Sequence, residues 1–90
     1  SAFAARNNNN ITGKVTEKGN GNPLPFATVT VQATDNKVIG GATTADNGTF
    51  TINNLPSSNF KLRVSFIGFK DTVITVAIKP GENTFNAGTI

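Results

Sequence analysis

The chain has 90 residues, enough for a single domain near the lower size limit of one hydrophobic core. It contains no Cys and no His. Disulfides, thiol chemistry, the commonest metal ligand and the commonest general acid–base side chain are therefore excluded. The formal net charge of +3 comes from 8 basic and 5 acidic residues. Because the basic residues are scattered along the chain, the charge does not predict a nucleic-acid-binding surface.

The first residues are predicted to form a disordered leader. The segment Ala2-Phe3-Ala4 has the small-x-small pattern of a signal-peptidase site, which indicates export, with a cloning scar or a chance match as the alternatives. Four consecutive Asn residues follow at 7–10 and offer nothing to a core. We expect a leader over residues 1–10 and a folded domain over residues 11–90. No apolar run approaches the ~20 residues of a membrane helix.

Strand signals then follow one another along the rest of the chain. In most of them polar and apolar residues alternate, which places one row of side chains inside and the other in solvent. Val, Ile, Phe and Thr are abundant and Leu is rare, so little helix is expected. Strands are predicted at about seven places, over residues 11–18, 26–34, 38–44, 50–52, 60–66, 73–79 and 84–90.

The clearest alternation begins at Phe60. Apolar residues stand at positions 60, 62, 64 and 66, and polar residues at 61, 63 and 65. This pattern predicts that Phe66 lies in the core and that Ser65 faces solvent. The sequence Ile67-Gly68-Phe69 then breaks the alternation, as a bulge or a corner does.

The sharpest turn signal is Asp46-Asn47-Gly48. Asn-Gly tolerates the positive φ angles of a tight hairpin, so we expect a hairpin with Thr44 in one arm and residues 50–52 in the other. Pro23 and Pro25 lack the amide that a central strand needs, which predicts an edge or loop there. Seven strands joined by short polar loops favour an antiparallel sandwich over a small barrel.

Four segments together resemble the carboxypeptidase-regulatory-like domain. They are ITGKV at 11–15, PLPFATV at 23–29, DNGTF at 46–50 and VSFIGFK at 64–70. The resemblance covers residues 11–79 and implies an all-β, seven-stranded antiparallel Greek-key β-sandwich of the transthyretin-like type, in the immunoglobulin-like class. The chain departs from the family at Thr44-Ala45, where Thr-Asp is frequent, and this loss of a carboxylate weakens any cation site.

The resemblance also implies a setting. Such domains resemble the N-terminal periplasmic modules of outer-membrane β-barrel proteins in Gram-negative bacteria, many of them TonB-dependent receptors. The expected partner is a downstream β-barrel or plug domain of the parent protein, with a periplasmic protein or a glycan as further partners. We expect no nucleic-acid partner and no direct membrane insertion.

The candidate chemical sites are weak. Asp46-Asn47 is the nearest approach to a calcium site, but one carboxylate falls short of the several that calcium uses, and we interpret the pair as a turn. A Ser nucleophile needs a base, and the chain has no His to supply it. The resemblance brings no catalytic residues to carry over. We therefore expect no enzyme activity, no cofactor and no metal.

The leading prediction is a non-catalytic accessory or interaction module of an exported, outer-membrane-associated protein. One alternative is a carbohydrate-binding module. Sugar-binding surfaces commonly stack rings on aromatic side chains, and Phe is the only aromatic residue present. Phe69 and Phe85 are the predicted contacts for a glycan or a partner, and Phe3 and Phe26 are also expected to be partly exposed. The other alternative is the regulatory domain of a zinc carboxypeptidase.

Overall fold

A computed structural model describes residues 9–56, 58–78 and 84–89, the last of these segments by its backbone alone. The strands are β1 (Asn9–Lys14), β2 (Thr28–Gln32), β3 (Val38–Thr43), β4 (Thr49–Leu55), β5 (Asn59–Ser65), β6 (Thr72–Ala77) and β7 (Thr84–Thr89). Over the described ranges, the chain forms no helix that is long and apolar enough to cross a membrane. The seven predicted strands are all present, with shorter bounds for most of them.

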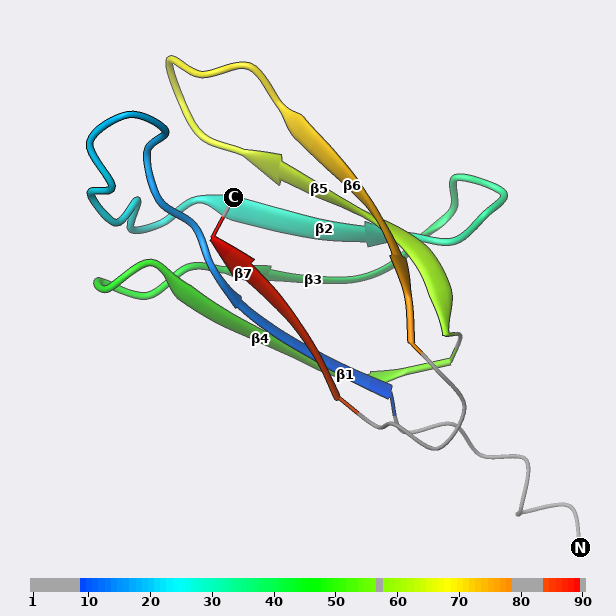
Figure 1. Ribbon diagram of the computed structural model, residues 1–90. Coiled ribbons are helices and arrows are strands. Elements are labelled where there is room, and N and C mark those ends of the chain that lie inside the picture. The colour runs from blue at the N-terminus through cyan, green and yellow to red at the C-terminus, as the bar shows by residue number, and fades with distance from the viewer. Residues whose placement is uncertain (1–8, 57, 79–83, 90) are drawn as a thin grey trace, which may run out of the picture.

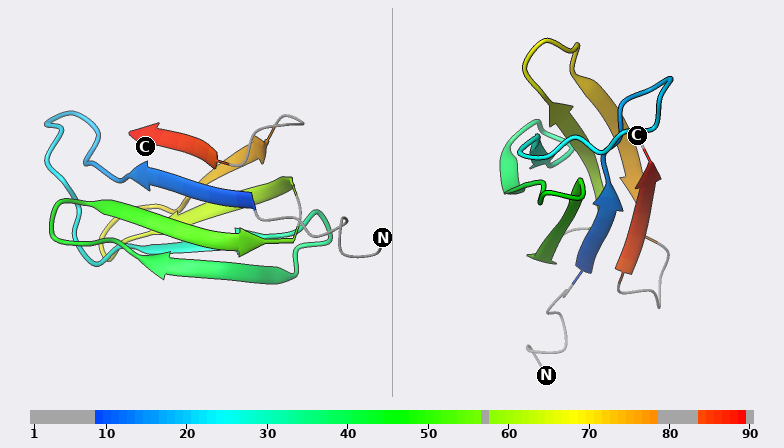
Figure 2. Two further views of the ribbon diagram at one scale, coloured as in Figure 1. Left: turned by 90° about the horizontal axis from the view of Figure 1, so that it is seen from below. Right: turned by 90° about the vertical axis from the view of Figure 1, so that its left-hand side faces the viewer.

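The strands form two sheets that pack face to face as a sandwich (Figures 1 and 2). One sheet has the order β4-β1-β7 and the other the order β3-β2-β5-β6. β2 pairs with both β3 and β5. Between β3 and β5 the chain crosses to the other sheet, where it forms β4, and then returns. This is a Greek-key type of connection. The predicted all-β sandwich is confirmed.

One strand pair differs from the antiparallel expectation. β1 and β7 are parallel, with Ile11 beside Phe85 and Asn10 beside Thr84. Both strands start at the same end of the sandwich (Figure 1). Parallel strands cannot be joined by a tight hairpin, and here the strands β2 to β6 lie between β1 and β7 along the chain.

The core lies between the sheets and is built by the alternating residues of the strands. In β5, Phe60, Leu62 and Val64 are buried while the residues between them are half-buried. Phe66 is only partly buried, because β5 ends at Ser65 and Phe66 stands just beyond the end of the ladder. The sequence predicts that Phe66 lies in the core, but it is only packed against the margin of the core. The buried apolar residues are Ile11, Val15, Ala27, Val29, Val31, Phe50, Ile52, Leu55, Phe60, Leu62, Val64, Val76 and Ile78.

The start of the domain also needs correction. Asn9 and Asn10 belong to β1, not to a disordered leader. Asn9 is buried and pairs with Leu55 of β4, and the side-chain oxygen of Asn10 accepts a hydrogen bond from the amide of Asn54 at 3.0 Å. The pairing of Asn9 and the hydrogen bond of Asn10 place both residues in the sheet, which composition alone does not reveal. The rest of the predicted leader, residues 1–8, lies outside the described residues.

The turn at Asp46-Asn47-Gly48 is present, but it does not close a hairpin. The side-chain oxygen of Asn47 accepts hydrogen bonds from the amide and the hydroxyl of Thr49, at 3.2 and 2.7 Å. β3 and β4 nevertheless lie in different sheets, and β4 pairs with β1 instead, with Thr49 beside Lys14. The turn is therefore a corner that carries the chain from one sheet to the other.

Candidate functional site

Exposed apolar side chains gather at one end of the sandwich. Phe26 is 70% exposed, Ile67 is 90% exposed and Phe69 is 46% exposed. Together with Phe66 they line one shallow hollow of about 740 Å³, which Pro25 and Asp71 also border. We call Phe26, Phe66, Ile67 and Phe69 the apolar cap. Large hydrophobic residues that cluster on a surface mark interaction sites more often than single ones do.

Phe26 is held outward by its backbone. It has a φ angle of 61°, in the left-handed region that bulky L-residues avoid. The amide of Phe26 donates a hydrogen bond to the carbonyl of Thr44 at 2.9 Å, and the next residue, Ala27, is fully buried. The surrounding structure therefore fixes a strained conformation that turns an aromatic ring into solvent, and such strain concentrates at functional sites.

The turn between β5 and β6 supplies the rest of the apolar cap. The amide of Phe69 donates to the carbonyl of Phe66 at 3.0 Å, and Gly68 has a φ angle of 87°, which Gly adopts without a steric penalty. This tight turn leaves Ile67 at its tip. It also returns Phe69 onto Phe66, with ring centroids 5.6 Å apart and planes tilted by 59°. The break in alternation predicted at this point is thus a turn.

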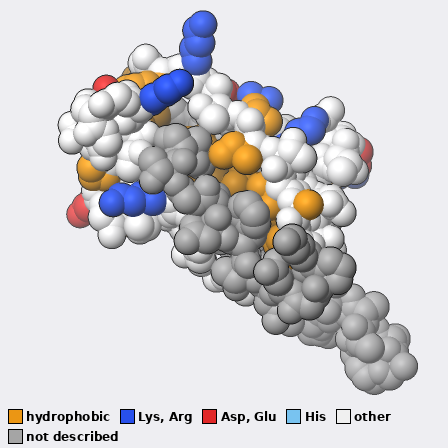
Figure 3. Space-filling model, in the orientation of Figure 1, with side chains coloured by type: hydrophobic (Ala, Val, Ile, Leu, Met, Phe, Trp, Pro, Cys, Tyr) orange, Lys and Arg blue, Asp and Glu red, His pale blue; other side chains and the backbone are white. Residues whose placement is uncertain are grey.

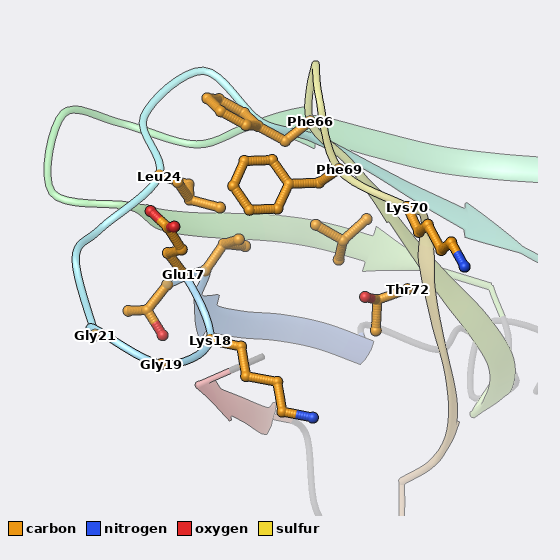
Figure 4. A pocket seen from close by; sticks show the side chains of 12 residues that line it. Glu17, Lys18, Gly19, Gly21, Leu24, Phe66, Phe69, Lys70 and Thr72 are labelled. Carbon is orange, nitrogen blue, oxygen red and sulfur yellow. The ribbon is translucent and has the colours of Figure 1, made fainter.

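A second hollow of about 650 Å³ lies beside the apolar cap (Figure 4). Its apolar lining comes from Val15, Leu24, Val64, Phe66 and Phe69. Its polar lining includes Glu17, Lys18, Lys70 and Thr72, and Figure 4 shows the two Lys amines on the side opposite Leu24. The rings of Phe66 and Phe69 border both hollows, so the apolar cap and this hollow form one continuous surface.

The charged side chains at this end of the sandwich include one exposed ion pair. Arg63 and Asp71 form an ion pair at 3.4 Å, with side chains that are 42% and 44% exposed. Such a pair contributes little to stability because water screens it. No group of three or more acidic side chains is gathered for a metal ion anywhere in the described part of the chain. The arrangement is suited to contact with an apolar surface that carries a few charges.

The structure describes only some of the Phe residues that the sequence predicts to be exposed. Phe69 lies in the apolar cap and Phe26 is exposed as expected, while the contact of Phe69 with a glycan or a partner stays a prediction. Phe85 lies in β7, but its side chain and the whole of Phe3 are outside the described residues, so those two predictions stay predictions. Sequence reasoning missed Ile67, whose signal is its place immediately before the Gly of a turn. It also missed both hollows, which arise from loops far apart in the sequence.

The sequence model of carboxypeptidase regulatory-like domains matches residues 10–87. The chain belongs to this family. Among curated proteins, no sequence matches the chain.

Solved structures share the fold of this carboxypeptidase regulatory-like domain. BcpA, the major pilin subunit of Bacillus cereus, aligns with a TM-score of 0.71 and 14% identity, over 91% of this chain and 29% of the pilin. Klebsiella pneumoniae 5-hydroxyisourate hydrolase aligns with a TM-score of 0.70 and 17% identity, over 91% of this chain and 89% of the hydrolase.

A third structure, a 9R-lipoxygenase from Cyanothece, aligns with a TM-score of 0.61 and 22% identity, over 92% of this chain and 16% of the lipoxygenase. At these identities the likeness shows the fold alone. The chain spans less than a third of the pilin and less than a fifth of the lipoxygenase. In those two proteins, the matching sandwich is one part of a longer chain.

Proposed function

We propose that this chain is a non-catalytic interaction module that docks through its apolar cap onto another folded domain of the same exported protein. The observation that carries the proposal is the outward Phe26 with its strained backbone, beside the exposed Ile67 and Phe69. Burying these three side chains against a partner would remove from water most of the large apolar surface at this end. Aromatic anchors of this kind supply much of the binding energy at protein interfaces.

The proposed setting is the periplasm of a Gram-negative bacterium. There the module would stand N-terminal to the plug or β-barrel of an outer-membrane receptor or transporter, such as a TonB-dependent receptor. Support comes from the four sequence segments that resemble such modules. The pilin and the lipoxygenase lend support of another kind, since each carries this sandwich within a longer chain. A carboxypeptidase is the alternative parent, and the same surface would then face the peptidase.

The proposed absence of catalysis rests on the groups that line the two hollows. Their acidic side chains are Glu17 and Asp71, and Asp71 is paired with Arg63. The sequence contains no His, the side chain that most often serves as a general acid or base in enzymes. The likeness to a hydrolase is one of fold, at 17% identity, and brings no catalytic group to this chain.

The docking proposal is tested with the parent reading frame. The 90-residue chain and the domain that follows it are produced separately, and their binding is measured by calorimetry. Ile67→Ser and Phe26→Ser should each weaken binding about tenfold or more, as expected for hot-spot residues. Val38→Ser is the matched control, because Val38 is 60% exposed and β3 begins at the opposite end of the sandwich (Figure 1). Equal binding by all three variants would disprove docking through the apolar cap.

Carbohydrate binding is the second candidate, and one observation favours it. The ring of Phe69 is 46% exposed and borders a hollow that also carries Lys70 and Thr72, so a sugar could stack on the ring and bond to polar neighbours. NMR titration with a panel of soluble oligosaccharides at millimolar concentration decides this point. Shifts confined to Phe69 and its neighbours, lost in Phe69→Ala, would support glycan binding. A spectrum without shifts would exclude it for the panel.

A further inference from the structure

β6 is an outer strand with one open side. It pairs with β5 in an unbroken antiparallel register from Val64–Thr72 to Asn59–Ala77. No described strand lies on its other side. Unpaired strand edges are templates for pairing with another chain, and proteins usually protect them.

The open side of β6 presents a defined set of backbone groups. The amide of Ile78 donates to the carbonyl of Ser58 at 2.8 Å, which marks this pair as hydrogen-bonded in the β5–β6 ladder. Hydrogen-bonded pairs alternate along an antiparallel ladder, so the even-numbered residues direct their backbone groups toward β5. The amides and carbonyls of Val73, Thr75 and Ala77 therefore point away from β5, toward the open side.

Within the described residues of β6 itself, none of the usual protective features of an edge strand is present. The sequence of β6 is TVITVA, without a charge, a Pro or a Gly, and its pairing with β5 has no bulge. The other described ladders all carry irregularities except β2–β5. Val73 is 46% exposed, and Figure 3 shows hydrophobic atoms open to solvent where Figure 1 places β6. β6 is therefore the best-formed open edge in the described part of the sandwich.

We propose that the β6 edge pairs with the β6 edge of a second copy of this chain, in an antiparallel register centred on Thr75. With Thr75 opposite the partner's Thr75, the outward backbone groups of Val73 meet those of the partner's Ala77. The two four-stranded sheets join into one, related by a twofold axis perpendicular to the sheet. This surface is separate from the apolar cap, and the inference does not depend on the proposed function.

The choice of a second copy rests on self-complementarity. In an antiparallel pair, residues directly opposite one another lie on the same face of the sheet. The register centred on Thr75 places Ile74 opposite the partner's Val76 on the inner face. On the outer face it places Val73 opposite the partner's Ala77 and Thr75 opposite its own equivalent. These three kinds of pair match in polarity, and the partly buried Ile74 gains cover. A shift by one residue would place inward side chains opposite outward ones.

Cysteine cross-linking tests the register, because the chain has no native Cys. In the proposed dimer the two Cα atoms at position 75 are about 5.5 Å apart, within the range that a disulfide spans. Thr75→Cys should form a covalent dimer under mild oxidation. Thr51→Cys is the control, since Thr51 is also an exposed Thr, in the edge strand β4. Equal dimer yields from the two variants would overturn the register.

Charge reversal tests the pairing without a covalent bond. Sedimentation should detect a monomer–dimer equilibrium of the unmodified chain between about 10 μM and 1 mM, as expected for a small interface. Thr75→Lys should weaken the dimer roughly fivefold, because like charges would stand opposite each other. An equimolar mixture of Thr75→Lys and Thr75→Glu should restore it as a heterodimer. A chain that stays monomeric up to about 1 mM, or a mixture that stays as weak as Thr75→Lys alone, would overturn the proposal.

Discussion

Thr44 and Ala27 are joined by two hydrogen bonds across the corner between β3 and the segment that leads into β2. The amide of Thr44 donates to the carbonyl of Ala27 at 2.9 Å, and the amide of Ala27 donates to the hydroxyl oxygen of Thr44 at 2.8 Å. The same hydroxyl donates to the carbonyl of Leu24 at 2.6 Å. One buried side chain thus fixes both ends of the segment that holds Phe26 outward.

Removing the Thr44 hydroxyl should destabilise the domain. Thr44→Val keeps the shape of the side chain but leaves the buried amide of Ala27 and the partly buried carbonyl of Leu24 without this hydrogen-bond partner. We expect the free energy of unfolding to fall by about 1–3 kcal/mol, measured by urea denaturation. Thr43→Val is the control, because Thr43 is exposed, and it should change the value by no more than about 0.5 kcal/mol. Equal losses would show that the hydroxyl of Thr44 has no special role.

The number and order of the strands could be predicted from the sequence, because each strand follows from a local alternation of side chains. The pairing of the strands could not. Asp46-Asn47-Gly48 gives the same local signal in a hairpin and in a corner between sheets. The outcome here depends on β4 pairing with β1, between residues more than thirty positions apart. The parallel pairing of β1 with β7 is of the same kind, because a strand pattern does not encode its direction.

In the candidate site, too, the sequence predicts local features but not those that depend on strand pairing. The sequence identifies Phe69 because it stands where an alternating strand ends. It does not indicate that Phe26, more than forty positions earlier in the sequence, lies beside the same turn, because that placement follows from the pairing of β2 with β5. The positive φ angle of Phe26 is equally hidden, since it is imposed by the hydrogen bonds around Thr44 rather than by any local preference.

Replacing Phe60 and replacing Phe66, which belong to the same alternating pattern, should destabilise the domain to different extents. Phe60 is 1% exposed, so Phe60→Ala should lower the free energy of unfolding by about 3–5 kcal/mol. Phe66 is partly buried at the margin of the core, and Phe66→Ala should lower it by about 1–3 kcal/mol. Ser65 is half-buried and follows the core residue Val64 in β5, and Ser65→Ala should change the free energy of unfolding by no more than about 0.5 kcal/mol. Urea denaturation measures all three, and a larger loss for Phe66→Ala than for Phe60→Ala would contradict the observed end of β5.

The ion pair between Arg63 and Asp71 should contribute little to folding. Its atoms are 3.4 Å apart and both side chains are more than 40% exposed, so water screens the attraction. A double-mutant cycle with Arg63→Gln and Asp71→Asn should give a coupling below about 0.5 kcal/mol, and added salt should lower it further because ions screen exposed charges. A coupling clearly above about 1 kcal/mol, the upper end for exposed pairs, would mean that the turn between β5 and β6 depends on this pair.

Gly48 should be the least replaceable Gly in the described chain. It has a φ angle of 82°, and a Cβ atom added there would lie 2.6 Å from the carbonyl oxygen of Val15 and 3.1 Å from the side chain of Pro23. That carbonyl cannot easily move away, because Val15 donates its own amide to the carbonyl of Gly48 at 2.8 Å. Gly48→Ala should therefore combine backbone strain with a steric clash.

Gly21→Ala separates these two effects. Gly21 has a similar φ angle of 73°, but nothing lies within 4 Å of the position that an added Cβ atom would take. This variant should therefore show strain alone, with a loss of about 1 kcal/mol of stability. Gly48→Ala should lose about 1–3 kcal/mol more than Gly21→Ala, as overpacking does. Thermal and urea unfolding of the two variants measure the difference. Equal losses would mean that the backbone at Val15 gives way, and that the corner between the two sheets is less rigid than its hydrogen bonds indicate.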